Sequence, residues 1–77
     1  MKKLLDCERG QKLRVVRLNA DYDLKQRLIS FGVMKGASIE VLEHAPGKKT
    51  IEIKVGKMRI ALRDQEAALI EVEESNE

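Results

Sequence analysis

Apolar and polar residues alternate most regularly in the second half of the chain. Residues 50–55, "TIEIKV", alternate strictly, and residues 58–62, "MRIAL", repeat the pattern. A period of two places successive side chains on opposite faces of a β-strand. Gly56 and Lys57 separate the two segments, and a two-residue loop that starts with glycine is typical of a type II′ hairpin. The pattern therefore predicts two antiparallel strands joined by a tight turn.

Three more segments have the composition of strands. Residues 12–18 are rich in aliphatic residues, residues 38–44 alternate, and residues 69–72 form a last short apolar run. Residues 63–69 are expected to form one short helical turn with Asp64 as its cap. The count is about five short strands.

One short helix is expected between the first two strands. Asp23, followed three residues later by Gln26, resembles a capping box with aspartate in the place of serine. The apolar side of this helix comprises Leu24, Leu28 and Phe31. We expect these three side chains to face the core, because their spacing is i, i+4, i+7. Gly32 is placed to end the helix in the left-handed conformation.

These elements predict a mainly β fold: a small, half-open β-barrel of about five strands with one short helix between the first two. We expect a single domain over residues 1–77, since a chain of 77 residues has no room for a second. Residues 74–77 are polar and expected to fray. The predicted turn residues are Gly32, Gly36, Pro46, Gly47 and Gly56.

Composition narrows the function classes. The chain has one Phe, one Tyr and no Trp, so its core must be aliphatic, and stacking of nucleic-acid bases is disfavoured. The net charge of +2 is too small to indicate nucleic-acid binding. Cys7 is the only cysteine, which excludes an internal disulfide and favours the cytoplasm. No segment resembles a signal peptide or a membrane span, so we expect no direct membrane insertion.

The residues that could carry chemistry are few. There is one histidine, no Cys-x-x-Cys motif and no phosphate-binding loop. Cys7 and His44 could form a nucleophile and base, but no third residue supports the pair. We therefore expect no enzymatic activity, no cofactor and no metal site. One alternative remains open: Cys7, His44 and Glu43 could hold a metal ion if a second chain completed the site.

Basic residues gather around the predicted hairpin. They are Lys48, Lys49, Lys54, Lys57, Arg59 and Arg63. We expect them to form a solvated outer face that keeps the sheet from pairing with other chains. The alternative is that they contact an acidic or phosphorylated partner.

The segment between the two glycines of "GVMKG" is the candidate binding surface. Val33 and Met34 are consecutive, and consecutive side chains in a turn diverge, so we expect neither to be fully buried. Val33 should cap the barrel and Met34 should be partly exposed. Met34 either covers the end of the core or forms, with Lys35 and Arg27, an apolar spot with a basic rim.

Several short motifs occur in a fixed order along most of the chain. "RLISFGVMKGASIEVLEHAP" is followed by "KVGKMRIALRDQEAALIEV". This combination resembles the FeoA family, the small SH3-like proteins of bacterial ferrous iron uptake. The matching positions are Arg27, Leu28, Phe31, Gly32, Val33, Met34, Gly36, Ile39, Val41, Pro46, Gly56, Ala61, Leu62, Arg63, Glu66, Ala67, Ile70 and Val72. Lys35 departs from the family, which commonly has proline there, so the turn should be less rigid.

The resemblance implies an SH3-like barrel acting as a non-catalytic cytosolic accessory protein. It would bind the membrane GTPase FeoB, through the cytosolic domain of FeoB, and be recruited by it to the inner membrane. Arg27, Val33, Met34, Lys35 and Arg63 are the expected contact residues. We expect a monomer or a weak oligomer. The alternatives are an iron-repressor-type regulatory module and a nucleic-acid-binding barrel.

Overall fold

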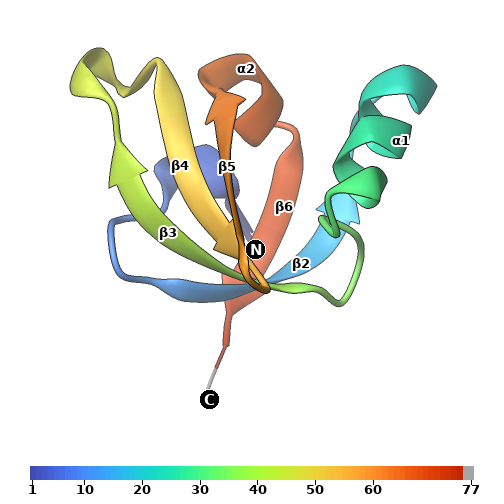
Figure 1. The fold of residues 1–77 in the computed structure, drawn as a ribbon, viewed down its shortest axis with the longest axis horizontal. Coiled ribbons are helices and arrows are strands. Elements are labelled where there is room, and N and C mark those ends of the chain that lie inside the picture. Colours follow the sequence, from blue (N-terminus) through green and yellow to red (C-terminus); the bar gives the residue numbers. More distant parts are fainter. Residues whose placement is uncertain (76–77) are drawn as a thin grey trace.

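The chain folds around one antiparallel sheet (Figure 1). The structure is a computed structural model that describes residues 1–75. The strands of this region are β1 (Lys2–Lys3), β2 (Lys12–Leu18), β3 (Ser38–His44), β4 (Thr50–Val55), β5 (Met58–Arg63) and β6 (Ile70–Glu74). They lie in the order β1-β6-β2-β3-β4-β5, and each neighbouring pair is antiparallel. The two edges of the sheet are therefore β1 and β5.

Short helical segments connect the strands. They are η1 (Leu4–Asp6), α1 (Tyr22–Ser30), η2 (Pro46–Lys48) and α2 (Asp64–Ala67). Register shifts in β2, between Val15 and Arg17, and in β3, between Val41 and Glu43, bend the sheet into the curved shape seen in Figure 1. Because α2 contacts β4, β5 and η1, while η1 contacts β6, these two segments lie across the open side of the half-barrel.

The predicted fold class is confirmed. All five predicted strands are present, and α1 connects the first two of them. The two-residue strand β1 is an addition, and it pairs with β6 through Lys2–Val72 and Lys3–Glu71. The last strand extends to Glu74, and the Ser75 N–H donates to the Lys12 carbonyl, so residues 74 and 75 are hydrogen-bonded to or paired with β2. Residues 76–77 of the predicted tail lie outside the described residues.

The hairpin of β4 and β5 has the predicted register and turn. Its pairs run from Thr50–Arg63 to Val55–Met58. Gly56 has a φ of +59°, and within residues 1–75 the one non-glycine residue with a positive φ is Lys48. A positive φ at the first turn residue alone is what a type II′ turn requires. The turn prediction is confirmed.

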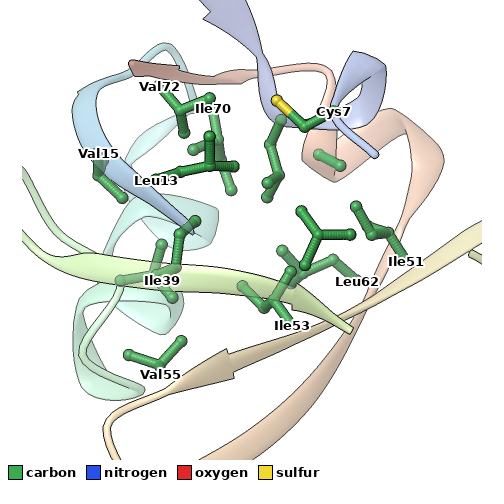
Figure 2. Packing of buried hydrophobic residues seen from close by; sticks show 14 of the residues in the cluster. Cys7, Leu13, Val15, Ile39, Ile51, Ile53, Val55, Leu62, Ile70 and Val72 are labelled. Carbon is green, nitrogen blue, oxygen red and sulfur yellow. The ribbon is translucent and has the colours of Figure 1, made fainter. Parts of the chain in front are cut away.

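The core is aliphatic, as the composition predicts (Figure 2). It comprises Leu4, Cys7, Leu13, Val15, Leu28, Val33, Ile39, Val41, Ile51, Ile53, Val55, Leu62, Ala67, Ile70 and Val72. Most of these residues alternate along the strands, so each strand contributes one face. Among the described residues, no polar or charged residue is buried with them. Burial of aliphatic surface is therefore the main stabilising contribution to this fold.

The helix α1 begins and packs differently from the prediction. Its N-cap is Asp21, whose carboxylate accepts from the Leu24 N–H at 2.9 Å, whereas Asp23 lies in the first turn. Leu28 is buried and Leu24 half-buried, as expected. Phe31, predicted to face the core, is 37% exposed, so that prediction is wrong.

Candidate functional site

The loop between α1 and β3, residues 31–37, holds three of the five residues predicted to contact a partner. They are Val33, Met34 and Lys35. The Gly36 N–H donates to the Val15 carbonyl at 2.8 Å, and the Val15 N–H donates to the Ala37 carbonyl at 2.9 Å. These bonds fasten the end of the loop to β2, so the loop presents its side chains from a fixed backbone.

Val33 is a core residue, which corrects its assignment to the binding surface. Its side chain is fully buried, with 0% exposure. The Val33 N–H donates to the Leu28 carbonyl at 2.9 Å, so the chain turns back onto the end of α1 at this point. This turn directs Val33 into the barrel. A residue without exposed surface cannot contact a partner, so Val33 contributes to the core beneath the loop and not to a binding surface.

Two apolar side chains of this loop face solvent. Met34 is 40% exposed, which confirms the prediction of partial exposure. Phe31 is 37% exposed, whereas Val33, two residues later, is fully buried. The exposed pair is therefore Phe31 and Met34 rather than Val33 and Met34. Lys35, the next residue, is also exposed.

Arg27 is part of a link between the two α-helices. Its guanidinium forms an ion pair with the carboxylate of Glu66 in α2. The second oxygen of this carboxylate accepts from the backbone N–H of Arg63 at 2.8 Å. Glu66 therefore brings together Arg27 and Arg63, two of the predicted contact residues. Both arginines remain exposed, at the ends of α1 and β5.

Glu66 is the residue of this link that the sequence interpretation did not include among the contact residues. Asp64 was expected to cap this turn, but Asp64 is the first residue of α2. Glu66 satisfies the Arg63 N–H from the third position of the helix, which is the glutamate half of a capping box. The three-residue spacing of Arg63 and Glu66 is a sequence signal for the cap. No sequence signal indicates the ion pair of Glu66 with Arg27, which lies 39 residues away.

The alternative metal site does not assemble from Cys7, His44 and Glu43. The Cys7 thiol is buried and donates to the Lys3 carbonyl at 3.5 Å. The His44 Nε2 lies 2.7 Å from the Cys7 carbonyl oxygen, not from the sulfur. Glu43 and His44 line a shallow surface hollow. Within residues 1–75, no group of three His, Cys, Asp or Glu side chains is placed to hold a metal ion.

Hydrogen bonding and burial define the surroundings of these two residues. A carbonyl oxygen only accepts, so the His44 Nε2 donates to the Cys7 carbonyl. Nδ1 is buried and has no hydrogen-bond partner in the described part of the chain. Burial raises the pKa of the Cys7 thiol above its ordinary value, which keeps Cys7 protonated and chemically inert. This arrangement fixes η1 against β3 rather than building a reactive pair.

No helix in the described region is long and apolar enough to cross a lipid bilayer.

Comparison with known protein sequences finds relatives over nearly the whole chain. The model of the FeoA domain matches residues 2–74. A Campylobacter jejuni protein that carries the name Fe(2+) transport protein A is 36% identical over 69 residues, which cover 90% of this chain and 93% of the relative. A Helicobacter pylori protein of the same name is 35% identical over 57 residues, or 74% of this chain and 75% of that one.

Solved structures with the same fold fall into two groups. The FeoA protein from Chlorobium tepidum has a TM-score of 0.90 at 30% identity, covering 95% of this chain and 70% of that one. The iron(II) transport protein A from Clostridium thermocellum has a TM-score of 0.89 at 37% identity, covering 95% and 45%. A manganese-dependent transcriptional repressor has a TM-score of 0.86 at 21% identity, covering 96% and 36%. At that identity the likeness to the repressor shows the fold alone.

Proposed function

This chain belongs to the FeoA family, which is involved in Fe(2+) transport, and from that premise we propose that it is a non-catalytic accessory protein of ferrous iron uptake. It acts in the cytoplasm, where it binds the cytosolic domain of the membrane GTPase FeoB and regulates or assembles that transporter. It uses no cofactor of its own. The transporter recruits it to the inner membrane.

The observation that supports a docking role is the exposed apolar pair on the fixed loop. Met34 and Phe31 are 40% and 37% exposed, while the loop backbone is fastened to β2. A thioether side chain is flexible and polarizable, so it adapts to an apolar surface. Because the backbone is already ordered, binding costs little conformational entropy. We define Phe31, Met34 and Lys35 as the loop patch.

The loop patch contains one cation, and a second cation precedes it in the chain. Lys35 lies beside Met34 in the chain, and Arg27 lies one helical turn before Phe31. The Arg27 side chain is 59% exposed while it pairs with Glu66. Exposed cations at the rim of an interface raise the association rate with an acidic partner more than they raise affinity. The patch therefore favours an apolar contact surrounded by carboxylates on the transporter.

Replacement of Met34 by aspartate tests this proposal. Tagged protein is incubated with membranes that contain FeoB, and the co-purified transporter is quantified beside the melting temperature of each variant. Met34→Asp should melt within a few degrees of the parent and reduce co-purification by about tenfold, because an apolar contact cannot accept a carboxylate.

Leu69→Asp is the matched control. Leu69 has a similar exposure of 36% and lies between α2 and β6, outside the loop patch. It should bind as the parent does. A folded Met34→Asp variant that binds normally would place the docking surface elsewhere, and an unfolded one would show that Met34 belongs to the core.

A further inference from the structure

The edge strand β5 has backbone N–H and C=O groups that form no hydrogen bond with another segment of the described residues. It pairs with β4 alone. In a two-residue hairpin the residues flanking the turn, Val55 and Met58, form a hydrogen-bonded pair, so Ile60 also directs its N–H and C=O toward β4. Arg59 and Ala61 therefore direct theirs away from the sheet. Within residues 1–75, no other segment hydrogen-bonds with the backbone of either residue.

The outer face of this edge is basic. Arg59, Ala61 and Arg63 are exposed, and Lys57 lies in the adjoining turn. Arg59 lies directly opposite Lys54 on β4, so the two cations repel each other across the strands. None of these four cations has an ion-pair partner in the described residues.

Carboxylates lie near these cations, and one of them, Glu66 of α2, accepts from the Arg63 N–H at 2.8 Å. Glu52 lies opposite Ala61, and Glu40 of β3 lies opposite Lys54. Glu52 is the diagonal neighbour of Arg59 and Arg63 across the hairpin, but no carboxylate of the described residues forms an ion pair with Lys57, Arg59 or Arg63. The positive charge of the edge is left for a group that approaches β5 from outside the sheet.

The inner face of the same strand is apolar and opens toward solvent. Exposure along it rises from Leu62, at 5%, through half-buried Ile60 to Met58, at 48%. The core is therefore uncovered at the turn end of β5. A strand added here would find apolar side chains on one face and cations on the other.

A second copy of this chain is a poor occupant of the edge. Pairing of β5 with another β5 would bring Arg59 and Arg63 of each chain beside their counterparts, and like charges across paired strands are destabilising. The other edge of the sheet, β1, is only two residues long. Charged residues of this kind are a common means of blocking self-association at an edge.

We propose that β5 is a docking edge for an extended segment of a partner protein in which acidic and apolar residues alternate. The partner's backbone hydrogen-bonds with Arg59 and Ala61. Its carboxylates lie beside Arg59 and Arg63, and its apolar side chains cover Met58 and Ile60. This surface is made of residues other than those of the loop patch, and the proposal goes beyond the proposed function.

The probe is a capped nine-residue peptide that alternates valine and glutamate, titrated into ¹⁵N-labelled protein at low salt. The amides of Arg59 and Ala61 should exchange rapidly in the free protein and become protected about tenfold or more on binding. A peptide that alternates valine and lysine should not bind. The valine–glutamate peptide with alternate backbone nitrogens methylated should also fail, because it keeps its charges but loses the donors that face β5.

Two charge variants of equal net charge test the electrostatic part. Arg59→Glu should weaken binding of the valine–glutamate peptide by about tenfold. Lys25→Glu, an exposed cation on α1, should change it by less than about twofold. Both variants should keep the parent's melting temperature, since neither side chain is buried.

Three results would overturn the proposal. The first is no response at Arg59 and Ala61 with the peptide at about 1 mM, a concentration that detects very weak binding. The second is equal binding of the methylated peptide, which would show contact by charge without strand addition. The third is protection of these amides that rises with the concentration of the protein alone, which would make a second copy the occupant.

Discussion

The β4–β5 hairpin and the loop between α1 and β3 meet at one end of the barrel, yet their residues are positioned in different ways. A Cβ built on Gly32 would lie 3.3 Å from the Val55 side chain, so the two regions are in contact. In the hairpin, the buried side of β4 is the one that the alternating pattern predicts. In the loop, one of two adjacent apolar residues, Val33, is fully buried while Met34 is 40% exposed.

The difference lies in where the deciding contacts are found. In a strand, the period of two fixes which side chains share a face, so neighbours in the sequence carry the information. In the loop, the direction of each side chain depends on backbone hydrogen bonds to Leu28 at the end of α1 and to Val15 of β2. The bond to Leu28 spans five residues and accompanies the glycine cap of the helix, whereas no local pattern encodes the bonds to Val15.

The largest expected effect tests the hairpin side of the comparison. Ile53 is completely buried on the inner face of β4. Ile53→Ala removes three carbons from the core and should lower the free energy of unfolding by about 2–5 kcal/mol. Urea denaturation followed by circular dichroism measures the change. A loss below about 0.5 kcal/mol would show that alternation does not identify the core of this strand.

The next largest effect is the difference in stability loss between alanine variants of the two adjacent loop residues, Val33 and Met34. Val33→Ala should lower the free energy of unfolding by about 1.5–3 kcal/mol, because its side chain is fully buried. Met34→Ala should cost less than about 0.5 kcal/mol, since much of its side chain already faces water. The same urea titration compares the two variants. Equal losses would contradict the divergence of these side chains that the structure shows.

The sequence predicts the fold well because most of it is built from alternating strands. The sequence does not predict β1, since two lysines show no alternation of apolar and polar residues. It places the helix cap at Asp23 instead of Asp21, because both residues are aspartates and the side chain alone does not distinguish them. For the candidate site, the partial exposure of Met34 follows from local reasoning. The burial of Val33 follows the glycine cap of α1, a local signal that the sequence interpretation did not use, because the Val33 N–H bonds to the Leu28 carbonyl across Gly32. The pairing of Arg27 with Glu66 depends on a long-range contact, so no local pattern predicts it.

Two glycines sharpen the comparison further. Gly32 and Gly56 both have a positive φ, at +91° and +59°. Gly56→Ala should cost about 1–2 kcal/mol, since a Cβ there meets nothing within 4 Å and only the backbone conformation is strained. Gly32→Ala should cost about 1 kcal/mol more, because its Cβ also presses on Val55 in the hairpin.

Thermal denaturation of the two glycine variants, analysed with a common heat capacity, measures this difference. Val55→Ala in the Gly32→Ala background is the control, because it removes the atom that the new Cβ would press upon. The two costs should then be less than additive. Additive costs would show that the loop and the hairpin do not press on each other at this point.

The smallest expected effect concerns the ion pair that joins α1 to α2. Arg27 is 59% exposed, so its pair with Glu66 is strongly screened, and Arg27→Ala should cost no more than about 0.5 kcal/mol. Glu66→Ala removes the ion pair and also the acceptor for the Arg63 N–H, and loss of such a cap costs about 0.5–2 kcal/mol.

Urea denaturation at low salt and in about 1 M NaCl distinguishes the contribution of the ion pair from that of the cap, because salt screens exposed charges. The effect of Arg27→Ala should vanish at high salt. Most of the effect of Glu66→Ala should persist, because the hydrogen bond from the backbone N–H of Arg63 to Glu66 does not depend on the Arg27 side chain. If both variants lose the same stability and both recover in salt, the carboxylate acts through its charge alone and the link to the hairpin at Arg63 contributes nothing.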